Sequence, residues 1–260
     1  MTGIRPTVDL NADVGESFGA YRLGDDAELM KHITSVNVAC GMHAGDPLIM
    51  RCTVALAKEA GVAVGAHPGY PDLQGFGRRH LALTPEEVEA FVIYQVGALQ
   101  AFCRAARVPL WHVKAHGALY NLAVRDAAVA DAIARAVARV DPGLILVGMA
   151  GSESLRAGER AGLRVASEAF ADRGYNPDGT LVARDRPGAV IHDPGVVVER
   201  VIRMVKEGTV TCNDGSEVAI RADTICFHGD TPGAADLVRL VRKGLEQAGM
   251  AVAPLHRLLP

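Results

Sequence analysis

The sequence predicts an α/β fold, a distorted seven-stranded β/α barrel of the TIM type with helices outside a parallel sheet. Three observations lead to it. Apolar, strand-like stretches alternate with helical segments, capping residues mark the helix starts, and polar side chains follow most strands. Alternating strand–helix units favour a parallel sheet. An open sheet gathers its ligand groups at one switch point, whereas polar groups after nearly every strand favour a closed barrel.

The helices are predicted from their start and stop signals. A capping residue followed by proline occurs four times, and proline suits the first helical position. Glycine follows three of the helices, where the chain turns into the left-handed conformation. The expected helices lie near residues 25–32, 47–60, 85–106, 126–139, 152–161, 194–207 and 232–248. The expected strands lie near residues 7–12, 34–40, 62–67, 110–115, 143–148, 163–168 and 223–228.

The segment 209–221 departs from the alternation of strand and helix. Two short β-prone runs flank Asn213-Asp214-Gly215, which is a good hairpin turn. We therefore expect a small β-hairpin inserted before the last barrel strand. Because no linker, repeat or low-complexity segment interrupts the chain, residues 1–260 are expected to form a single barrel domain.

Composition argues against several classes of protein. The 260 residues carry a formal net charge of −3 and no block of lysine or arginine, so no nucleic-acid partner is expected. No apolar run reaches the roughly 18 residues of a membrane span, and no signal peptide precedes the first strand. No CxxC pair occurs among the five cysteines, and Cys40, Cys52, Cys103 and Cys226 lie in apolar surroundings. We expect buried free thiols and a cytoplasmic location.

Alternation along the strands separates polar from apolar faces. Asp9, Asn11 and Asp13 share one face of the first strand, whereas Val8 and Leu10 lie on the other and would pack against helices. The polar faces must therefore point into the barrel. The same alternation groups His112, Lys114 and His116 on the fourth strand, and Cys226, His228 and Asp230 on the seventh.

These inward groups have two interpretations. Charges inside a barrel are costly unless they are paired or hydrogen-bonded, so the deepest, Asp9 and His112, could belong to a purely structural network. Groups near the strand ends face the mouth of the barrel and are candidates for chemistry. These candidates are Asp13, Lys114, His116, His228 and Asp230.

The histidines raise the question of a metal ion. His112 and His116 have the i, i+4 spacing of zinc ligands on a helix, but on a strand they lie about 13 Å apart at ~3.3 Å per residue. They could not easily bind one ion. A divalent ion held by groups from different strands remains a hypothesis, with Asp13, His43, His67 and His116 as its ligands.

Glycine-rich loops follow several strands and let the backbone approach a ligand, but the chain contains neither GxxxxGK[ST] nor GxGxxG. A self-contained ATP or dinucleotide site is therefore not predicted. Arg78, Arg79 and Arg184 could bind a carboxylate or phosphate, or lie solvated on the surface. Glu168 ends the sixth strand and is a stronger candidate.

Seven sequence blocks resemble the LamB/YcsF family, in order and over nearly the whole chain. They are 9–16 (DLNADVGE), 39–46 (ACGMHAGD), 65–72 (GAHPGYPD), 75–79 (GFGRR), 112–121 (HVKAHGALYN), 170–173 (FADR) and 228–230 (HGD). One departure is Ala115, at a position where the family pattern is expected to have proline. The substitution leaves Lys114 and His116 in place.

The resemblance implies a distorted barrel like those of glycoside hydrolases and polysaccharide deacetylases. It also implies a hydrolase acting on a cyclic amide, namely ATP-dependent hydrolysis of 5-oxoproline (pyroglutamate) to L-glutamate. This chain would then be the A component of a 5-oxoprolinase, working with subunits B and C. The absence of a nucleotide loop fits ATP being handled largely by those partners. A homo-oligomer is left open.

Opening a lactam requires an activated carbonyl and a supplied proton, because the amide is resonance-stabilised. Asp13 or His116 is expected to act as general base on water. Lys114 and His43 would stabilise the oxyanion, and His228 with Asp230 would orient a proton donor. The residues expected to bind substrate are Asn11, Glu16, His67, Glu168, Arg173 and Arg79.

Two other functions stay open. The first is a stand-alone, metal-dependent amidohydrolase or deacetylase, which needs neither ATP nor partners but loses activity on chelation. The second is a non-catalytic component that only binds a lactam. The number of charged groups at the predicted mouth argues against pure binding, since a neutral lactam needs few of them.

Overall fold

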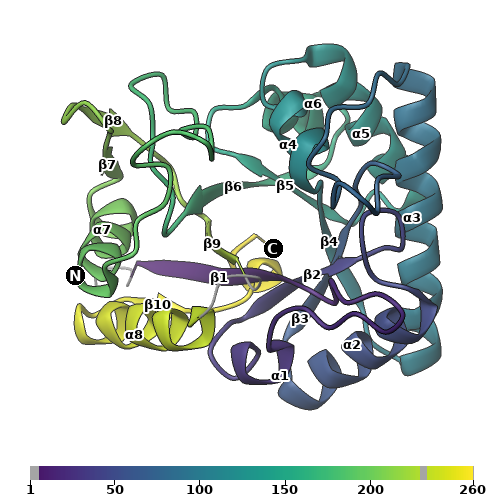
Figure 1. Cartoon of the computed structure of the whole chain (residues 1–260), viewed down its shortest axis with the longest axis horizontal. Helices are drawn as coiled ribbons and strands as arrows, with labels where there is room; N and C mark the ends of the chain where they lie inside the picture. The colour runs from purple at the N-terminus through teal and green to yellow at the C-terminus, as the bar shows by residue number, and fades with distance from the viewer. Residues whose placement is uncertain (1–5, 229–232, 260) are drawn as a thin grey trace.

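Seven parallel strands close into a barrel in the computed structural model, which describes residues 6–228 and 233–259 (Figure 1). The strands pair in sequence order, and the last pairs with both the sixth and the first. The predicted closed, seven-stranded parallel barrel is therefore confirmed. The barrel strands are β1 (Thr7–Val14), β2 (Ser35–Ala39), β3 (Ala63–His67), β4 (Leu110–Lys114), β5 (Ile145–Met149), β6 (Arg164–Phe170) and β9 (Thr224–His228).

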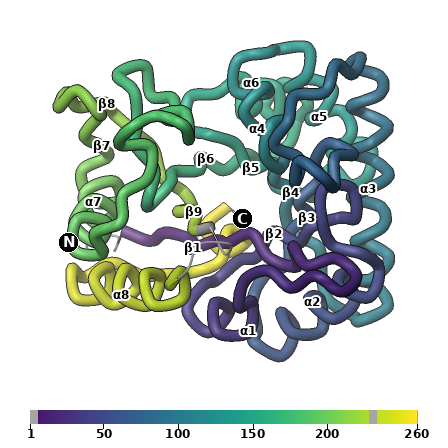
Figure 2. The backbone as a smooth tube through the Cα atoms, viewed as in Figure 1, coloured from purple at the N-terminus to yellow at the C-terminus, as the bar shows by residue number. Residues whose placement is uncertain are grey.

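Helices cover the outside of the barrel, as Figures 1 and 2 show. On one side α3 packs against α5 and α2, and on the opposite side α7 packs against α8. The helices are α1 (Asp26–Leu29), α2 (Pro47–Ala60), α3 (Pro85–Ala106), α4 (Gly117–Ala123), α5 (Ala127–Val140), α6 (Glu153–Arg160), α7 (Pro194–Lys206), α8 (Ala234–Gln247) and α9 (Leu255–Leu258). In the described part of the chain, no helix is long and apolar enough to cross a membrane.

Three of the four predicted capping residues begin their helices as expected, and the fourth, Thr231 with Pro232, lies outside the described residues. The side chain of Asp46 accepts hydrogen bonds from the backbone at the start of α2, and Asp193 does the same at α7. Thr84 and Glu87 form a reciprocal capping box at α3. Each cap satisfies N–H groups that have no partner inside the helix. These local signals explain why the predicted helix starts agree closely with the observed ones.

Three elements were not predicted. The short helix α4 follows β4, strand β10 (Ala251–Val252) pairs with β1 outside the barrel, and α9 lies at the C-terminal end. The predicted hairpin is confirmed as β7 (Thr209–Thr211) and β8 (Glu217–Ala219), which pair antiparallel. Elements of only two to seven residues carry too little periodicity to stand out in a sequence.

The core lies between the barrel and its helices. Val8, Leu10 and Ala12 are fully buried on the outer face of β1, while Asp9 and Asn11 are buried on the inner face. The predicted assignment of the two faces is confirmed for this strand. The barrel interior is therefore polar, and its hydrogen bonds have to be made within it.

The cysteines are free thiols, as expected, but not all are buried. Cys40, Cys103, Cys212 and Cys226 are buried, whereas Cys52 is exposed. The prediction for Cys52 was wrong because its apolar neighbours along the chain belong to the buried face of α2, and Cys52 lies on the outer face.

Candidate functional site

The bottom of the barrel interior is a closed hydrogen-bond network around Asp9. Its carboxylate accepts from Thr34 Oγ1 at 2.7 Å and Ser35 Oγ at 2.6 Å, and also from Thr224 Oγ1. Burial raises the pKa of Asp9 to about 6, although these three hydroxyl groups act in the opposite direction. Asp9 is fully buried, so this layer matches the structural interpretation.

A second layer lies above it, in which the side-chain amide of Asn37 on β2 bonds to residues of β1 and β4. Asn37 Nδ2 donates to Asn11 Oδ1 at 2.7 Å and to Asp13 Oδ1 at 2.9 Å. Asn37 Oδ1 lies 2.9 Å from His112 Nε2, which must be the protonated ring nitrogen because a carbonyl oxygen only accepts. Burial and the nearby Lys114 ammonium lower the pKa of His112 to about 3. This histidine is therefore a neutral structural donor.

Lys114 occupies the third layer between two carboxylates. Its Nζ lies 3.0 Å from Asp13 Oδ1 and 2.8 Å from Glu168 Oε1. Burial acts to lower the pKa of Lys114, but Asp13, Cys226 and Glu168 outweigh it and raise the pKa above its ordinary value. The chain thus holds a buried ammonium group where three strands end.

Four side chains gather beside this ammonium, from the ends of β1, β2, β3 and β4. The rings of His43 and His116 stack with centroids 3.7 Å apart, and His67 meets His116 edge-on. Glu16 Oε1 lies 3.5 Å from His43 Nε2 and 3.6 Å from His116 Nδ1. One ligand atom from each of these four residues lies within 4.8 Å of the others. Glu16 thus joins three of the four predicted metal ligands, and Asp13 Oδ2 lies 3.3 Å from His67 Nε2.

Burial keeps two of these rings neutral at pH 7. It lowers the pKa of His116 to about 3, and it lowers that of His43 well below its usual range. Neighbouring histidines act in the same direction in both cases. Neutral imidazoles are the form that donates a lone pair to a metal ion or accepts a proton.

Backbone geometry positions these rings. His116 begins α4, and its N–H donates to Pro68 O at 2.8 Å, which ties the end of β4 to the loop after β3. Gly77 has a φ of 63°, and a Cβ there would lie 2.8 Å from both His116 and His43. Gly65 faces His112, where a Cβ would lie 2.1 Å from Nε2. Only glycine allows the rings such close approach.

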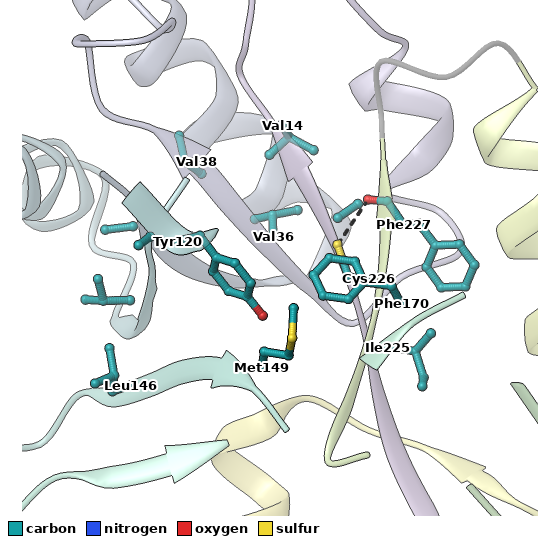
Figure 3. Close-up of a cluster of buried hydrophobic side chains, with 14 of the residues drawn as sticks. Val14, Val36, Val38, Tyr120, Leu146, Met149, Phe170, Ile225, Cys226 and Phe227 are labelled. Atoms are coloured by element: carbon teal, nitrogen blue, oxygen red, sulfur yellow. Dashed lines mark hydrogen bonds between the residues drawn. The ribbon is translucent and has the colours of Figure 1, made fainter. Parts of the chain in front are cut away.

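A pocket of about 730 Å³ opens above these groups. Asp13, Lys114 and His116 are among the residues that line it. Tyr120, Met149 and Phe170 also line it, and Figure 3 shows their side chains gathered near the ends of the strands. Burial, and then the neighbouring Glu168 carboxylate, raise the pKa of Tyr120, so its phenol stays protonated.

Four arginines also line the pocket, but not all are available to a ligand. Arg173 is buried and donates to Ala189 O and Val182 O, so it holds the segment after β6 in place. The remaining three, Arg78, Arg125 and Arg184, are exposed, and Arg125 pairs with Asp178 at 2.9 Å. Figure 2 shows the green segment that carries Arg184 running from β6 to α7.

Arg79 lies elsewhere. It pairs with Asp72, which lowers the pKa of that carboxyl, and it does not line the pocket. The structure thus separates Arg79 from its neighbour Arg78, which does line the pocket.

The structure brings together most of the predicted site residues. The residues that come together are Asp13, Glu16, His43, His67, Lys114, His116 and Glu168, of which Asp13, His67, Lys114 and His116 line the pocket. Asn11 Nδ2 donates a hydrogen bond to Glu168 Oε1 at 3.1 Å. Asp230 lies outside the described residues. His228 ends β9 beside Asp13, and its side chain is likewise outside the described part.

Sequence reasoning missed Asn37 and Tyr120. Asn37 could have been found from the alternation Ser35-Val36-Asn37, which puts both polar side chains on the inner face of β2. Tyr120 is four residues beyond His116, on the first turn of a helix that was not predicted. Its position in the pocket depends on that helix.

A pocket that carries acid–base groups at the carboxyl ends of parallel strands is typical of β/α-barrel enzymes, and the pocket of this chain is of that class. Comparison with known proteins then identifies the family. The LamB/YcsF family profile matches residues 8–260. The A component of the 5-oxoprolinase from Thermococcus onnurineus is 56% identical over 252 residues, covering 97% of this chain and 99% of the relative. The chain belongs to the LamB/YcsF family.

Solved structures agree with this assignment. The lactam utilization protein from Thermus thermophilus superimposes with a TM-score of 0.91 at 53% identity, covering 95% of this chain and 99% of that one. A peptidoglycan N-acetylglucosamine deacetylase from Eubacterium rectale gives a TM-score of 0.51 at 10% identity, over 98% and 90% of the two chains. The second likeness shows the fold alone, and it confirms the expected deacetylase type of barrel.

Proposed function

We propose that this chain is the A component of a 5-oxoprolinase, which hydrolyses the lactam 5-oxoproline to L-glutamate together with subunits B and C. The observation that carries the proposal is the Lys114 ammonium, held between Asp13 and Glu168 on the floor of the pocket. The names of the Thermococcus onnurineus and Thermus thermophilus relatives support a lactam substrate. The five free cysteines suit a reducing compartment such as the cytoplasm.

The chemistry required is the addition of water to a resonance-stabilised carbonyl. The water oxygen attacks the carbonyl carbon, the C–N bond breaks, and the ring nitrogen takes up a proton. In the proposal, Asp13 accepts the proton of the water and Lys114 stabilises the negative charge on the former carbonyl oxygen. In the proposal, the neutral phenol of Tyr120, which also lines the pocket, donates a hydrogen bond to the substrate.

Asp13 suits the role of base better than His116. His116 Nε2 carries its ring proton towards Phe76 O at 2.8 Å and has no lone pair to offer, and the lone pair of Nδ1 faces His67 Nε2 at 2.9 Å. Asp13 Oδ1 is held by Lys114 and Asn37, which fixes the carboxylate beside the pocket. A carboxylate that is held in this way stays in position whether or not it carries the proton.

ATP enters the proposal through the partner proteins B and C. The sequence contains no P-loop or dinucleotide fingerprint, so this chain would receive a substrate already activated, for example by phosphorylation of the carbonyl oxygen. Addition of water and cleavage of the C–N bond would then leave an acyl phosphate, and a second water would release glutamate and inorganic phosphate. Arg78 and Arg184, exposed at the pocket, give it a cationic edge, which suits the substrate carboxylate or a phosphoryl group.

The test is an oxoproline turnover assay on the chain alone and on the reconstituted complex, with and without ATP. The proposal expects glutamate to form only when ATP and both partners are present. Glutamate formation by the chain alone without ATP would favour a stand-alone amidohydrolase. Unchanged turnover by the complex carrying Lys114→Met would favour a component that only binds the lactam.

A further inference from the structure

His67 and His116 face each other with their inner nitrogens 2.9 Å apart. The outer nitrogen of each ring lies 2.8 Å from a backbone carbonyl oxygen, Lys114 O for His67 Nδ1 and Phe76 O for His116 Nε2. A carbonyl oxygen can only accept, so both outer nitrogens carry the ring proton. In two neutral rings, the inner nitrogens therefore present lone pairs to each other.

Lone pairs at this separation repel unless a positive species lies with them. The nearest side-chain groups on the same side are carboxylates, which also offer only lone pairs when ionised. Asp13 Oδ2 lies 3.3 Å from His67 Nε2, and Glu16 Oε1 lies 3.6 Å from His116 Nδ1. The cluster therefore has a surplus of electron-pair donors directed at one small volume.

The distances between these donors match those between ligands of one ion. Metal–nitrogen and metal–oxygen bonds of about 2.0–2.1 Å separate neighbouring ligands by about 2.8–3.0 Å at a right angle and about 3.5–3.6 Å at 120°. The three separations above, 2.9, 3.3 and 3.6 Å, fall in this range. The structure shows this spacing in a buried place, where His67 and His116 are 1% and 4% exposed.

His43 offers a further ligand. Neither of its ring nitrogens makes a hydrogen bond to any atom of the described residues, although the side chain is fully buried. Its ring is parallel to that of His116, with an interplanar angle of 3°, so both lone pairs cannot point at one ion as they stand. A rotation of the His43 ring would bring Nε2, already 3.5 Å from Glu16 Oε1, into the ligand set.

We propose that His67, His116 and Glu16 bind a divalent first-row transition-metal ion, with His43 and Asp13 completing its coordination. The carbonyls of Lys114 and Phe76 would then act as the outer groups that fix each ring's tautomer, as partners of metal-bound histidines do. Imidazole with carboxylate favours zinc, cobalt or manganese over magnesium or calcium. The site borders the pocket, because Asp13, His67 and His116 line it. The ion's role, polarising a lactam carbonyl or a water, rests on the proposed function, but its binding does not.

The first test measures metal on the wild-type full-length chain, without any activity assay. We expect about one equivalent of metal after purification, loss of it on prolonged dialysis against a chelator, and recovery with Co²⁺. The Co²⁺ protein should show visible d–d absorption bands. Failure to take up Zn²⁺, Mn²⁺ or Co²⁺ at micromolar concentration overturns the proposal. The proposal is also overturned if the chain takes up no metal and its NMR spectrum shows a proton shared between His67 and His116.

The second test uses variants with the same readout. His67→Gln and Glu16→Gln should each weaken Co²⁺ binding at least 10-fold, whereas His43→Ala should weaken it less. His80→Ala is the matched control, because His80 is exposed and outside the cluster. Circular dichroism separates loss of metal from loss of fold. Equal binding by wild type and both Gln variants rejects the site. Metal binding without oxoproline turnover would leave the site standing and reject the proposed function instead.

Discussion

Lys114 Nζ lies 2.8 Å from Glu168 Oε1, and this buried pair joins strand β4 to strand β6 inside the barrel. Lys114 also reaches Asp13 on β1, so one ammonium group connects three strands. Two carboxylates and one ammonium leave the group as a whole negative. A pocket floor of this kind depends on the ammonium, since removing Lys114 leaves two buried carboxylates without a counter-ion.

Lys114→Met should both destabilise the barrel and abolish turnover. It leaves the carboxylates of Asp13 and Glu168 close together without a counter-ion, at a cost of about 3–5 kcal/mol in the free energy of unfolding. Urea denaturation followed by circular dichroism measures that cost. Lys206→Met, on the exposed face of α7, is the control and should unfold as the wild type does. A cost below about 1 kcal/mol would mean that the pair contributes little to stability.

Asp13→Asn should separate chemistry from folding. The amide retains the size of the carboxylate and can still accept from Asn37, but it cannot take a proton from water. We expect turnover of the reconstituted complex to fall by roughly 10²- to 10⁴-fold, the usual contribution of a general base. The comparison is His116→Gln, which should reduce turnover through the metal and not as a base. Near-normal turnover by Asp13→Asn would reject the assignment.

Asp9 predicts a pH dependence of stability. Its pKa is raised from 3.8 to about 6 in the folded protein, mainly by burial, so the folded state holds the proton more tightly than the unfolded state. Stability from this group is therefore present below about pH 4 and is lost as the pH rises towards 6. Two pKa units correspond to about 3 kcal/mol.

The check for Asp9 compares wild type with Asp9→Asn from about pH 4 to about pH 7. The asparagine does not titrate, so the stability of the wild type relative to the variant should fall by up to about 3 kcal/mol across this range. Unfolding in urea at each pH gives the two free energies. A constant difference between the two proteins would show that Asp9 does not titrate there.

Arg184→Ala should weaken substrate binding more than it slows the reaction. Arg184 is exposed at the pocket, where an arginine–anion contact is partly screened by solvent. We expect KM of the reconstituted complex for 5-oxoproline to rise roughly 3- to 10-fold with kcat little changed, since the contact is similar in ground and transition states. Arg186→Ala, exposed but outside the pocket lining, is the matched control. A fall in kcat at unchanged KM would place Arg184 in the chemical step.

Local patterns in the sequence determined much of this protein. Capping residues gave the helix starts, and alternation gave the inward face of β1, where Asp9, Asn11 and Asp13 all lie as predicted. Both signals depend on residues a few positions apart, which is why they can be read directly from the chain. The hairpin turn at Asn213-Asp214-Gly215 is equally local.

Tertiary structure alone decided how these faces meet. His67 and His116 are 49 positions apart and come into contact only because β3 and β4 are neighbours in the barrel and their two following loops are joined by the His116–Pro68 hydrogen bond. The same closure gives Arg173 a structural role while leaving Arg184 at the pocket. Strand tilt and stagger set which side chains share a layer, and these quantities belong to the closed barrel as a whole, not to any one segment.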